Sequence, residues 1–388
     1  MKKVGVLTFS FCALFLVSCT TTFTRAMVRR DASVDDYLYF PERKIAKSEV
    51  PNEIKREIDG GLTAVLEDLF DAGNFSDFIA KTQTQAFLII KDNSLVFETY
   101  GKGCGRESIV TSFSVAKSFD SAMIGKLIEE KKILGVNQSI TDFIPELLER
   151  DTRFSKIRIC DLLGMTSGIN YSKKSRDDTK TYFDPNLRNL AINGTRIQTE
   201  PDEVFLYNNY NPLLLGIIIE RAAGKSVSSY MEEKIWKSMG AEYDAGWSLD
   251  SKEDGFEKME SGINARAIDF ARFGCLFRDM GIVDGTQVIS KEWILESLFD
   301  HHKGNPNFYA DEFGKKIKNE EKGGYYGYFW YGLHREDFSR DDFFAAGNKS
   351  QIIYVCPKSN TVIVRFGRKD GINFWKWISA FYDLAGRI

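Results

Sequence analysis

The sequence predicts an α+β protein in which an antiparallel sheet is flanked by N- and C-terminal helices and interrupted by a mostly helical insertion. Strand-like runs occur within residues 86–100 and again within 326–366. The residues between 133 and 255 are mainly helical and rich in loops. A closing helical pattern places five large apolar residues on one face, namely Phe374, Trp377, Ile378, Phe381 and Leu384.

The composition is that of a globular protein. The chain has 388 residues, of which 43% are hydrophobic and 28% are charged, and its formal net charge is -3. Because this balance lacks the basic footprint that nucleic-acid binding normally leaves, we expect no nucleic-acid partner. The length fits two domains or one large domain with an insertion. We place the sheet domain at residues 56–125 and 256–388, with the mainly helical insertion at 126–255.

The first residues are typical of an export signal. Two lysines precede an almost entirely apolar stretch at residues 4–17, which is shorter than the ~20 residues that span a bilayer. The residues just before Cys19 resemble a bacterial lipobox, in which this cysteine is lipidated. We therefore expect a lipoprotein signal peptide at 1–18, a tether over 19–55, and a lipid-anchored protein of the bacterial cell envelope that faces the periplasm or the exterior. An ordinary cleaved signal is the alternative.

The first half of the remaining chain opens on a helical pattern at residues 58–70. Two β-rich runs, 86–90 and 95–100, flank a turn-forming tetrapeptide and predict a hairpin. From Ser114 onward the pattern becomes helical, because four apolar residues fall on one face, namely Ala116, Phe119, Met123 and Leu127. These elements supply the first part of the expected sheet domain.

The second half contains two further helices and then strands. Pro212 opens a strongly apolar helix that should stop at Gly224, and another helix is expected at about 266–280. The expected strands that follow are 326–333, 343–346, 351–356 and 361–366. Antiparallel pairing of these strands with the early hairpin would complete the sheet.

The residue types exclude several kinds of chemistry. The chain has only 3 histidines, it lacks the Gly-x-Ser-x-Gly and His-Glu-x-x-His motifs, and its cysteines show no metal-binding spacing. We therefore expect no His-based triad, no metal site and no cofactor. The four cysteines outside the signal segment are expected to be free thiols, namely Cys104, Cys160, Cys275 and Cys356.

A Ser-x-x-Lys pattern is the main candidate for chemistry. Ser114 and Lys117 stand at the start of a predicted helix, where this spacing puts both side chains on one face. A serine hydroxyl needs a neighbouring base to attack a carbonyl, and a buried lysine can be that base. Tyr207, about 90 residues downstream, could shuttle the proton, and Asn209 could donate to the lysine or to a substrate.

Several motifs occur in a fixed order around these candidates. They are Thr-Ser-Phe-Ser-Val-Ala-Lys-Ser at 111–118, Asp-Leu-Leu-Gly-Met-Thr-Ser-Gly at 161–168, Tyr-Asn-Asn at 207–209 with the apolar run 214–220, and the segment 262–274. Together they resemble the serine hydrolases of the class C β-lactamase and penicillin-binding-protein superfamily, in particular its esterase or 6-aminohexanoate-dimer-hydrolase-like branch. The resemblance runs from about residue 85 to the C-terminus and implies a β-lactamase/transpeptidase-like fold.

The resemblance also implies roles for individual residues. Ser114 would be the nucleophile, and Lys117 and Tyr207 would share the role of general base. Asn209 would face the substrate. The counterpart of the family's third motif is Ala-Ala-Gly at 345–347, and the substrate and oxyanion positions there would be Ala346, Gly347, Asn348 and Gln351.

One departure from the family pattern bears on the substrate. Ala345 stands where the family usually has Lys or His, and Met165 stands where His is common. In penicillin-recognising members the first of these positions helps to bind the substrate carboxylate, so its loss weakens the case for β-lactams and stem peptides. We expect hydrolysis of a small-molecule ester or amide, or of a cell-wall-related substrate. The alternatives are a β-lactamase or D-alanyl-D-alanine carboxypeptidase, and a non-catalytic lipoprotein binding module on the same fold.

Overall fold

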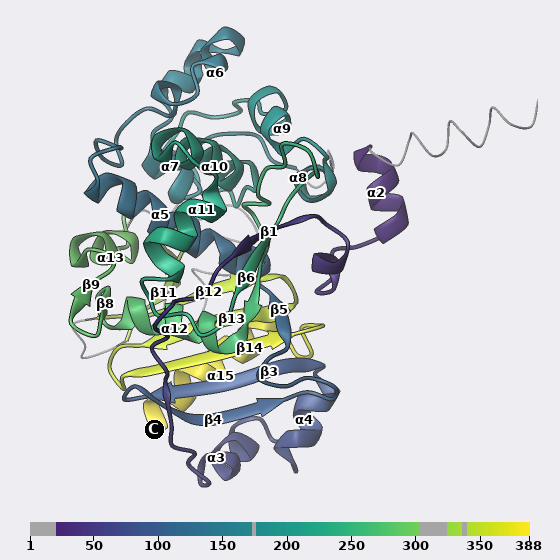
Figure 1. Cartoon of the computed structure of the whole chain (residues 1–388), viewed down its shortest axis with the longest axis vertical. Coiled ribbons are helices and arrows are strands. Elements are labelled where there is room, and N and C mark those ends of the chain that lie inside the picture. The colour runs from purple at the N-terminus through teal and green to yellow at the C-terminus, as the bar shows by residue number, and fades with distance from the viewer. Residues whose placement is uncertain (1–20, 173–175, 303–323, 336–339) are drawn as a thin grey trace, which may run out of the picture.

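An eight-stranded sheet forms the lower half of the molecule (Figure 1). The protein is described from a computed structural model, which describes residues 21–172, 176–302, 324–335 and 340–388. Neighbouring strands are antiparallel throughout, apart from the parallel pair at the β2 edge. In spatial order the strands are β10 (Gly324–Tyr326), β11 (Tyr331–Leu333), β12 (Asp342–Gly347), β13 (Gln351–Cys356), β14 (Thr361–Gly367), β3 (Thr84–Lys91), β4 (Ser94–Tyr100) and β2 (Lys55–Arg56).

Helices cover both faces of this sheet, which explains why its central strands are apolar on both sides. A Cβ on Gly274 of α12 (Ala267–Arg278) would touch Ile353 and Val355 of β13. The residue between these two, Tyr354, packs instead against Phe381 of α15 (Phe374–Arg387). Because alternate residues of a strand point to opposite faces, α12 and α15 lie on opposite sides of the sheet. Two short helices, α3 (Leu62–Leu69) and α4 (Phe75–Lys81), pack with α15 and β3, respectively.

The upper half is mainly helical and is centred on α5 (Ala116–Glu129) and α10 (Tyr210–Ala223), which pack against each other (Figure 1). The Phe119 ring of α5 stacks on Phe273 of α12 with a centroid distance of 3.6 Å, so α5 joins the helical half to the sheet. The other helices are α6 (Glu146–Arg150), α7 (Ile159–Leu163), α8 (Asp177–Phe183), α9 (Leu187–Asn193), α11 (Val227–Met231) and α13 (Lys291–Ser297).

A second sheet of four short strands lies between the two halves. Its order is β1 (Glu42–Ile45), β6 (Ala245–Ser248), β7 (Ile263–Arg266) and β5 (Ile109–Thr111). A separate two-stranded hairpin is made by β8 (Ile282–Val283) and β9 (Thr286–Gln287). The four-stranded sheet matters for the site because β5 leads directly into the turn that carries Ser114.

The predicted elements agree with the structure in order and type. The early hairpin, the helices after Ser114 and around Pro212, the final strands and the last helix are all present, and the α+β fold class is confirmed. The helix around Pro212 ends at Gly224 in the left-handed conformation, as expected for a C-terminal glycine. One predicted strand, 326–333, is in fact β10 and β11 joined by a turn in which Phe329 has a φ of 61°.

The N-terminal segment differs from the expected tether over 19–55. A helix, α2 (Thr22–Arg29), packs on α8, and β1 pairs with β6. Thr22 Oγ1 donates to Asp184 Oδ2 at 2.6 Å, and Arg25 Nη1 donates to the Asp250 carbonyl at 2.6 Å. Much of this polar segment is therefore part of the folded domain, because its charged side chains find partners on distant loops. Among the described residues, no helix is long and apolar enough to cross a membrane.

Candidate active site

The candidate nucleophile sits on a tight turn between β5 and α5. Ser112, just before it, is tied to β7 by two hydrogen bonds: its backbone N–H donates to the Ile263 carbonyl at 2.8 Å, and its Oγ accepts from the Ile263 N–H at 3.1 Å. The next residue, Phe113, has a φ of 42°, which is strained for a side chain other than glycine. Strain of this kind persists where surrounding contacts enforce it and is common at active sites. The turn thus presents Ser114 at the N-terminal end of α5.

Lys117 contacts the nucleophile directly. Its side chain is only 1% exposed, and its Nζ donates to Ser114 Oγ at 2.8 Å. The same Nζ donates to the backbone carbonyl of Glu260 at 3.0 Å and lies 5.1 Å from the centre of the Tyr207 ring. The structure therefore brings together the three residues that the sequence predicts as catalytic.

Asn209 stands at the cavity beside Ser114. Its Nδ2 donates to the Tyr171 hydroxyl at 2.9 Å, and that hydroxyl donates to Asp178 Oδ1 at 2.5 Å. The Asn209 Oδ1 is buried and has no hydrogen-bond partner among the described residues. Since a buried amide oxygen normally accepts a hydrogen bond, this atom is suited to receive one from a ligand. Sequence analysis did not single out Tyr171 or Asp178.

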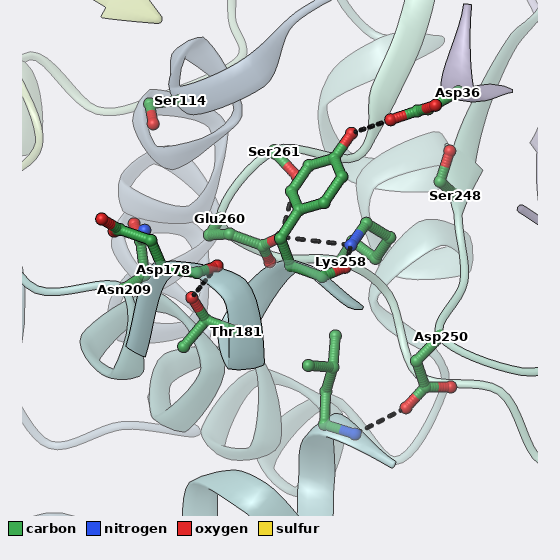
Figure 2. Close-up of polar contacts among 12 residues, drawn as sticks. Asp36, Ser114, Asp178, Thr181, Asn209, Ser248, Asp250, Lys258, Glu260 and Ser261 are labelled. Atoms are coloured by element: carbon green, nitrogen blue, oxygen red, sulfur yellow. Dashed lines mark hydrogen bonds and ion pairs between the residues drawn. The ribbon is translucent and has the colours of Figure 1, made fainter. Parts of the chain in front are cut away.

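A buried ion pair that sequence analysis also missed lies behind Lys117. Lys258 and Glu260 are 2% and 3% exposed, and their Nζ and Oε1 atoms are 3.4 Å apart (Figure 2). The Lys258 Nζ also donates to the Tyr182 carbonyl and lies 3.9 Å from the centre of that ring, while Ser261 Oγ donates to Glu260 Oε1 at 2.8 Å. Burial lowers the pKa of Lys258, and the Glu260 carboxylate opposes that shift. The pair fixes the loop whose carbonyl holds Lys117.

Lys258→Met is expected to destabilise the protein by about 3 kcal/mol, because it leaves the Glu260 carboxylate buried without its cation. The double variant Lys258→Met and Glu260→Gln should recover much of this loss, since both charges are then removed. Urea unfolding of the two single variants and the double variant measures the coupling between the residues. Strictly additive losses would contradict the inferred pair.

Strand β12 runs close to the nucleophile turn. A Cβ built on Gly347 would lie 2.6 Å from the Ser112 carbonyl oxygen and 2.9 Å from the Ser114 nitrogen, so only glycine fits there. Ala346 immediately precedes it in the strand, and Asn348 lines the cavity with Ser114. These three predicted positions are therefore near the candidate nucleophile.

Two other residues of this region, Gln351 and Ala345, offer no free polar group to the cavity. Gln351 is fully buried, and its amide group bonds to the backbone of the neighbouring strand. Its Nε2 donates to the Gly367 carbonyl at 2.7 Å, and its Oε1 accepts from the Gly367 N–H at 2.8 Å. This pairing differs from the substrate role predicted for Gln351, because both of its polar atoms already have partners. Ala345 is buried opposite Ile353 and adds no polar group.

Gly347→Ala is expected to lower kcat by about 100-fold, since the added methyl group would push β12 away from the Ser114 nitrogen and misplace the site by a few tenths of an ångström or more. Gly60→Ala is the matched control, because a Cβ there meets no atom within 4 Å. Ester turnover of both variants, with unfolding curves to exclude loss of fold, measures the effect. Equal activity in the two would contradict the close approach.

A cavity of about 410 Å³ lies beside Ser114. Ser114, Asn209 and Asn348 stand in its wall together with Glu260 and Ser261 of the loop before β7. The N-terminal segment supplies a further part of the wall through Ala26, Arg30, Asp31 and Ala32. In the described part of the chain, no group of three or more His, Cys, Asp or Glu side chains could hold a metal ion.

The chain and its fold are similar to those of known hydrolases. One relative is the 6-aminohexanoate-dimer hydrolase of Paenarthrobacter ureafaciens, 25% identical over 301 residues, or 74% of this chain and 73% of the relative. The fold resembles that of a Bacillus anthracis protein described as a 6-aminohexanoate-dimer hydrolase, with a TM-score of 0.74, 21% identity and 92% of each chain covered. It also resembles EstCE1, a hydrolase with promiscuous acyltransferase activity, with a TM-score of 0.67, 13% identity, and coverage of 84% of this chain and all of that one.

A family model described as Beta-lactamase matches residues 72–373, which is most of the chain and includes every candidate catalytic residue. A match of this extent, with the fold and the Ser-x-x-Lys geometry already described, identifies the protein as a serine hydrolase. The chain belongs to the Beta-lactamase family.

Proposed function

We propose that the protein hydrolyses an ester or amide bond through an acyl-enzyme on Ser114. The observation that carries this proposal is the 2.8 Å hydrogen bond from Lys117 Nζ to Ser114 Oγ, made by a lysine that is almost fully buried. A buried amine beside a hydroxyl can accept its proton once the amine is neutral, which makes the oxygen nucleophilic.

The reaction would proceed in two steps, acylation of Ser114 and deacylation by water. Lys117, together with Tyr207, takes the hydroxyl proton of Ser114 as Oγ bonds to the substrate carbonyl carbon. The alcohol or amine then leaves with a proton returned from the same base, and the acyl group stays on Ser114. In the second step, water gives a proton to this base as its oxygen bonds to the acyl carbon. The base then returns the proton to Ser114 Oγ as the acyl–Oγ bond breaks, which releases the acid and restores the serine hydroxyl.

The oxyanion of each tetrahedral intermediate would be held by two backbone N–H groups, one from Ser114 and one near Asn348. The tight contact of Gly347 with the Ser114 nitrogen supports this assignment, because it brings the end of β12 next to the nucleophile turn. In other hydrolases each such donor contributes roughly 3–4 kcal/mol to transition-state stabilisation. Asn209 Oδ1 would accept a hydrogen bond from the substrate.

The cavity favours neutral or cationic substrates over carboxylates. Among the described residues, its wall carries the acidic residues Asp31, Asp178 and Glu260 and one arginine, Arg30, and Ala345 brings no cation to the strand beside it. This charge pattern supports an ester or amide over a β-lactam or D-alanyl-D-alanine peptide, both of which carry a carboxylate. The direct contact between Ser114 and Lys117 likewise supports a catalyst over a binding module.

We also propose that the chain is held to the bacterial cell envelope by a lipid on Cys19 and faces the periplasm or the exterior. The apolar stretch at 4–17 and the lipobox-like residues before Cys19 support this anchor. Metabolic labelling with a palmitate analogue should mark the protein, and Cys19→Ser should remove the label. Full labelling of Cys19→Ser would contradict the anchor.

A fluorophosphonate probe tests the proposed nucleophile, because it reacts with activated serines. We expect the probe to map to the peptide that contains Ser114, and labelling of another residue would contradict the assignment. A nitrophenyl ester, an anilide and nitrocefin should then be compared on the same sample. Turnover of nitrocefin well above that of the ester would favour the β-lactamase alternative, and an unlabelled folded protein would favour the binding module.

A further inference from the structure

The helix α2 carries three exposed large apolar side chains, Phe23, Met27 and Val28, which are together called its apolar face. These side chains are 60%, 62% and 65% exposed. The opposite side of the helix is fixed to the domain, since Arg25 donates to the Asp250 carbonyl and Arg29 pairs with Asp36. Clustered apolar side chains of this size, held outward by a polar attachment, mark an interaction surface.

This apolar face borders the cavity that contains Ser114. Ala26 and Arg30 of the same segment line the cavity wall. Ala26 and Met27 follow Phe23 by three and four residues, so these three side chains are neighbours on one side of the helix. Whatever covers Phe23 and Met27 therefore lies at the rim of the cavity.

The chain that precedes α2 indicates what covers this face. Thr22 follows Cys19 by three residues, and an extended chain spans at most about 3.3–3.6 Å per residue. If Cys19 is held at a bilayer, the start of α2 lies within about 10 Å of that bilayer. Helices that lie in a membrane interface bury their apolar faces to a depth of ~5–10 Å. The distance from Cys19 to the start of α2 is therefore similar to the depth at which such a helix lies in the interface.

We propose that the apolar face of α2 inserts into the lipid bilayer surface, so that the cavity opens at the membrane interface and takes its substrate from it. The substrate class is an ester or amide of an amphiphile whose apolar part stays in the bilayer. The docking surface rests on the proposed lipid anchor, and the substrate class rests on the proposed hydrolase function of Ser114. The two parts are tested by separate measurements.

The first measurement is the depth of α2 in the membrane. The full chain carrying Met27→Cys is labelled with an environment-sensitive fluorophore and reconstituted in phosphatidylethanolamine–phosphatidylglycerol vesicles that contain a lipid-borne quencher. We expect quenching several-fold above that of the same label at Leu295→Cys, a site on α13 that is 47% exposed. The unsubstituted chain, labelled in the same way, gives the background from native thiols.

Equal quenching at the two sites would overturn the docking surface. Shielding of position 27 from aqueous iodide without quenching by the lipid would also overturn it, because a second copy or another protein would then cover the face. This readout does not depend on catalysis, so it stands whatever the outcome for Ser114.

The second measurement compares two substrates. The triple variant Phe23→Ser, Met27→Ser and Val28→Ser should turn over a long-chain acyl ester embedded in vesicles at least about tenfold more slowly than the unsubstituted chain. Its turnover of a soluble short-chain ester should stay within twofold, because these side chains do not line the cavity. Equal rates on the embedded ester would overturn the interfacial substrate.

A matched triple variant controls for the loss of exposed apolar surface. Leu134→Ser, Leu295→Ser and Phe299→Ser remove side chains that are 85%, 47% and 59% exposed and lie outside α2. This control should keep full activity on both substrates. If the unsubstituted chain hydrolyses neither ester, the proposed function fails, while the quenching experiment still decides where α2 lies.

Discussion

Ser114→Ala is expected to abolish hydrolysis of a short-chain nitrophenyl ester, with kcat reduced by roughly ten-thousand-fold or more. The reason is that the variant lacks the Oγ atom, which accepts the hydrogen bond of Lys117 at the N-terminal end of α5 and would attack the substrate carbonyl. The variant should keep its fold, because the Ser114 side chain is only partly buried and its replacement removes a single hydrogen bond. Steady-state kinetics and an unfolding curve on the same preparation measure both effects.

Ser118→Ala is the matched control for this variant. Ser118 lies one turn further along α5, is buried, and donates its hydroxyl to the Phe329 carbonyl at 2.8 Å. Its loss should cost about 1 kcal/mol of stability and leave ester turnover nearly unchanged. Full activity of Ser114→Ala, or a loss of activity in Ser118→Ala equal to that in Ser114→Ala, would contradict the role of Ser114.

Arg365→Met is expected to be the most destabilising single change, at about 4 kcal/mol. Arg365 of β14 is fully buried, and its guanidinium donates to four backbone carbonyls and one hydroxyl, those of Lys349, Ser350, Thr82, Lys369 and Thr84. Methionine would fill the space but leave these acceptors without donors. Two of them belong to the turn after β12, so catalysis should fall together with stability.

Arg368→Met provides the comparison for Arg365. Arg368 is half-exposed and, among the described residues, its guanidinium pairs with Asp35 alone, so its replacement should cost less than about 1 kcal/mol. Thermal and urea unfolding of both variants measure the difference. A similar loss of stability in the two variants would show that the buried hydrogen bonds of Arg365 contribute little to holding the turn.

The elements that the sequence predicts well are those with a strong local pattern. Strand β3 and the helix ending at Gly224 are continuous apolar runs between turn residues, and α15 is amphipathic with a regular helical spacing. The pairing of Ser114 with Lys117 is also visible in a short stretch of sequence, because the two residues are one helical turn apart. Tyr207 and Asn209 are distant in sequence from Ser114, so they can be predicted only from the order of motifs along the chain.

The features that sequence reasoning missed depend on contacts between distant residues. Strand β1 pairs with β6 about 200 residues away, and both are only four residues long, so neither carries a usable pattern. Lys258 and Glu260 look like solvated charges until tertiary packing buries them. The family resemblance places Gln351 at the cavity, but the change to extended backbone after the turn directs its side chain to Gly367.

The order of strands in the large sheet has a consequence for biosynthesis. Strand β3, near the start of the domain, pairs with β14, near its end, so about 270 residues separate two central neighbours. During translation, which delivers roughly 5–20 residues per second, β3 waits many seconds for this partner. The β12 strand that completes the site beside Ser114 is also made late. Catalytic competence is therefore expected only after nearly the whole polypeptide has been synthesised.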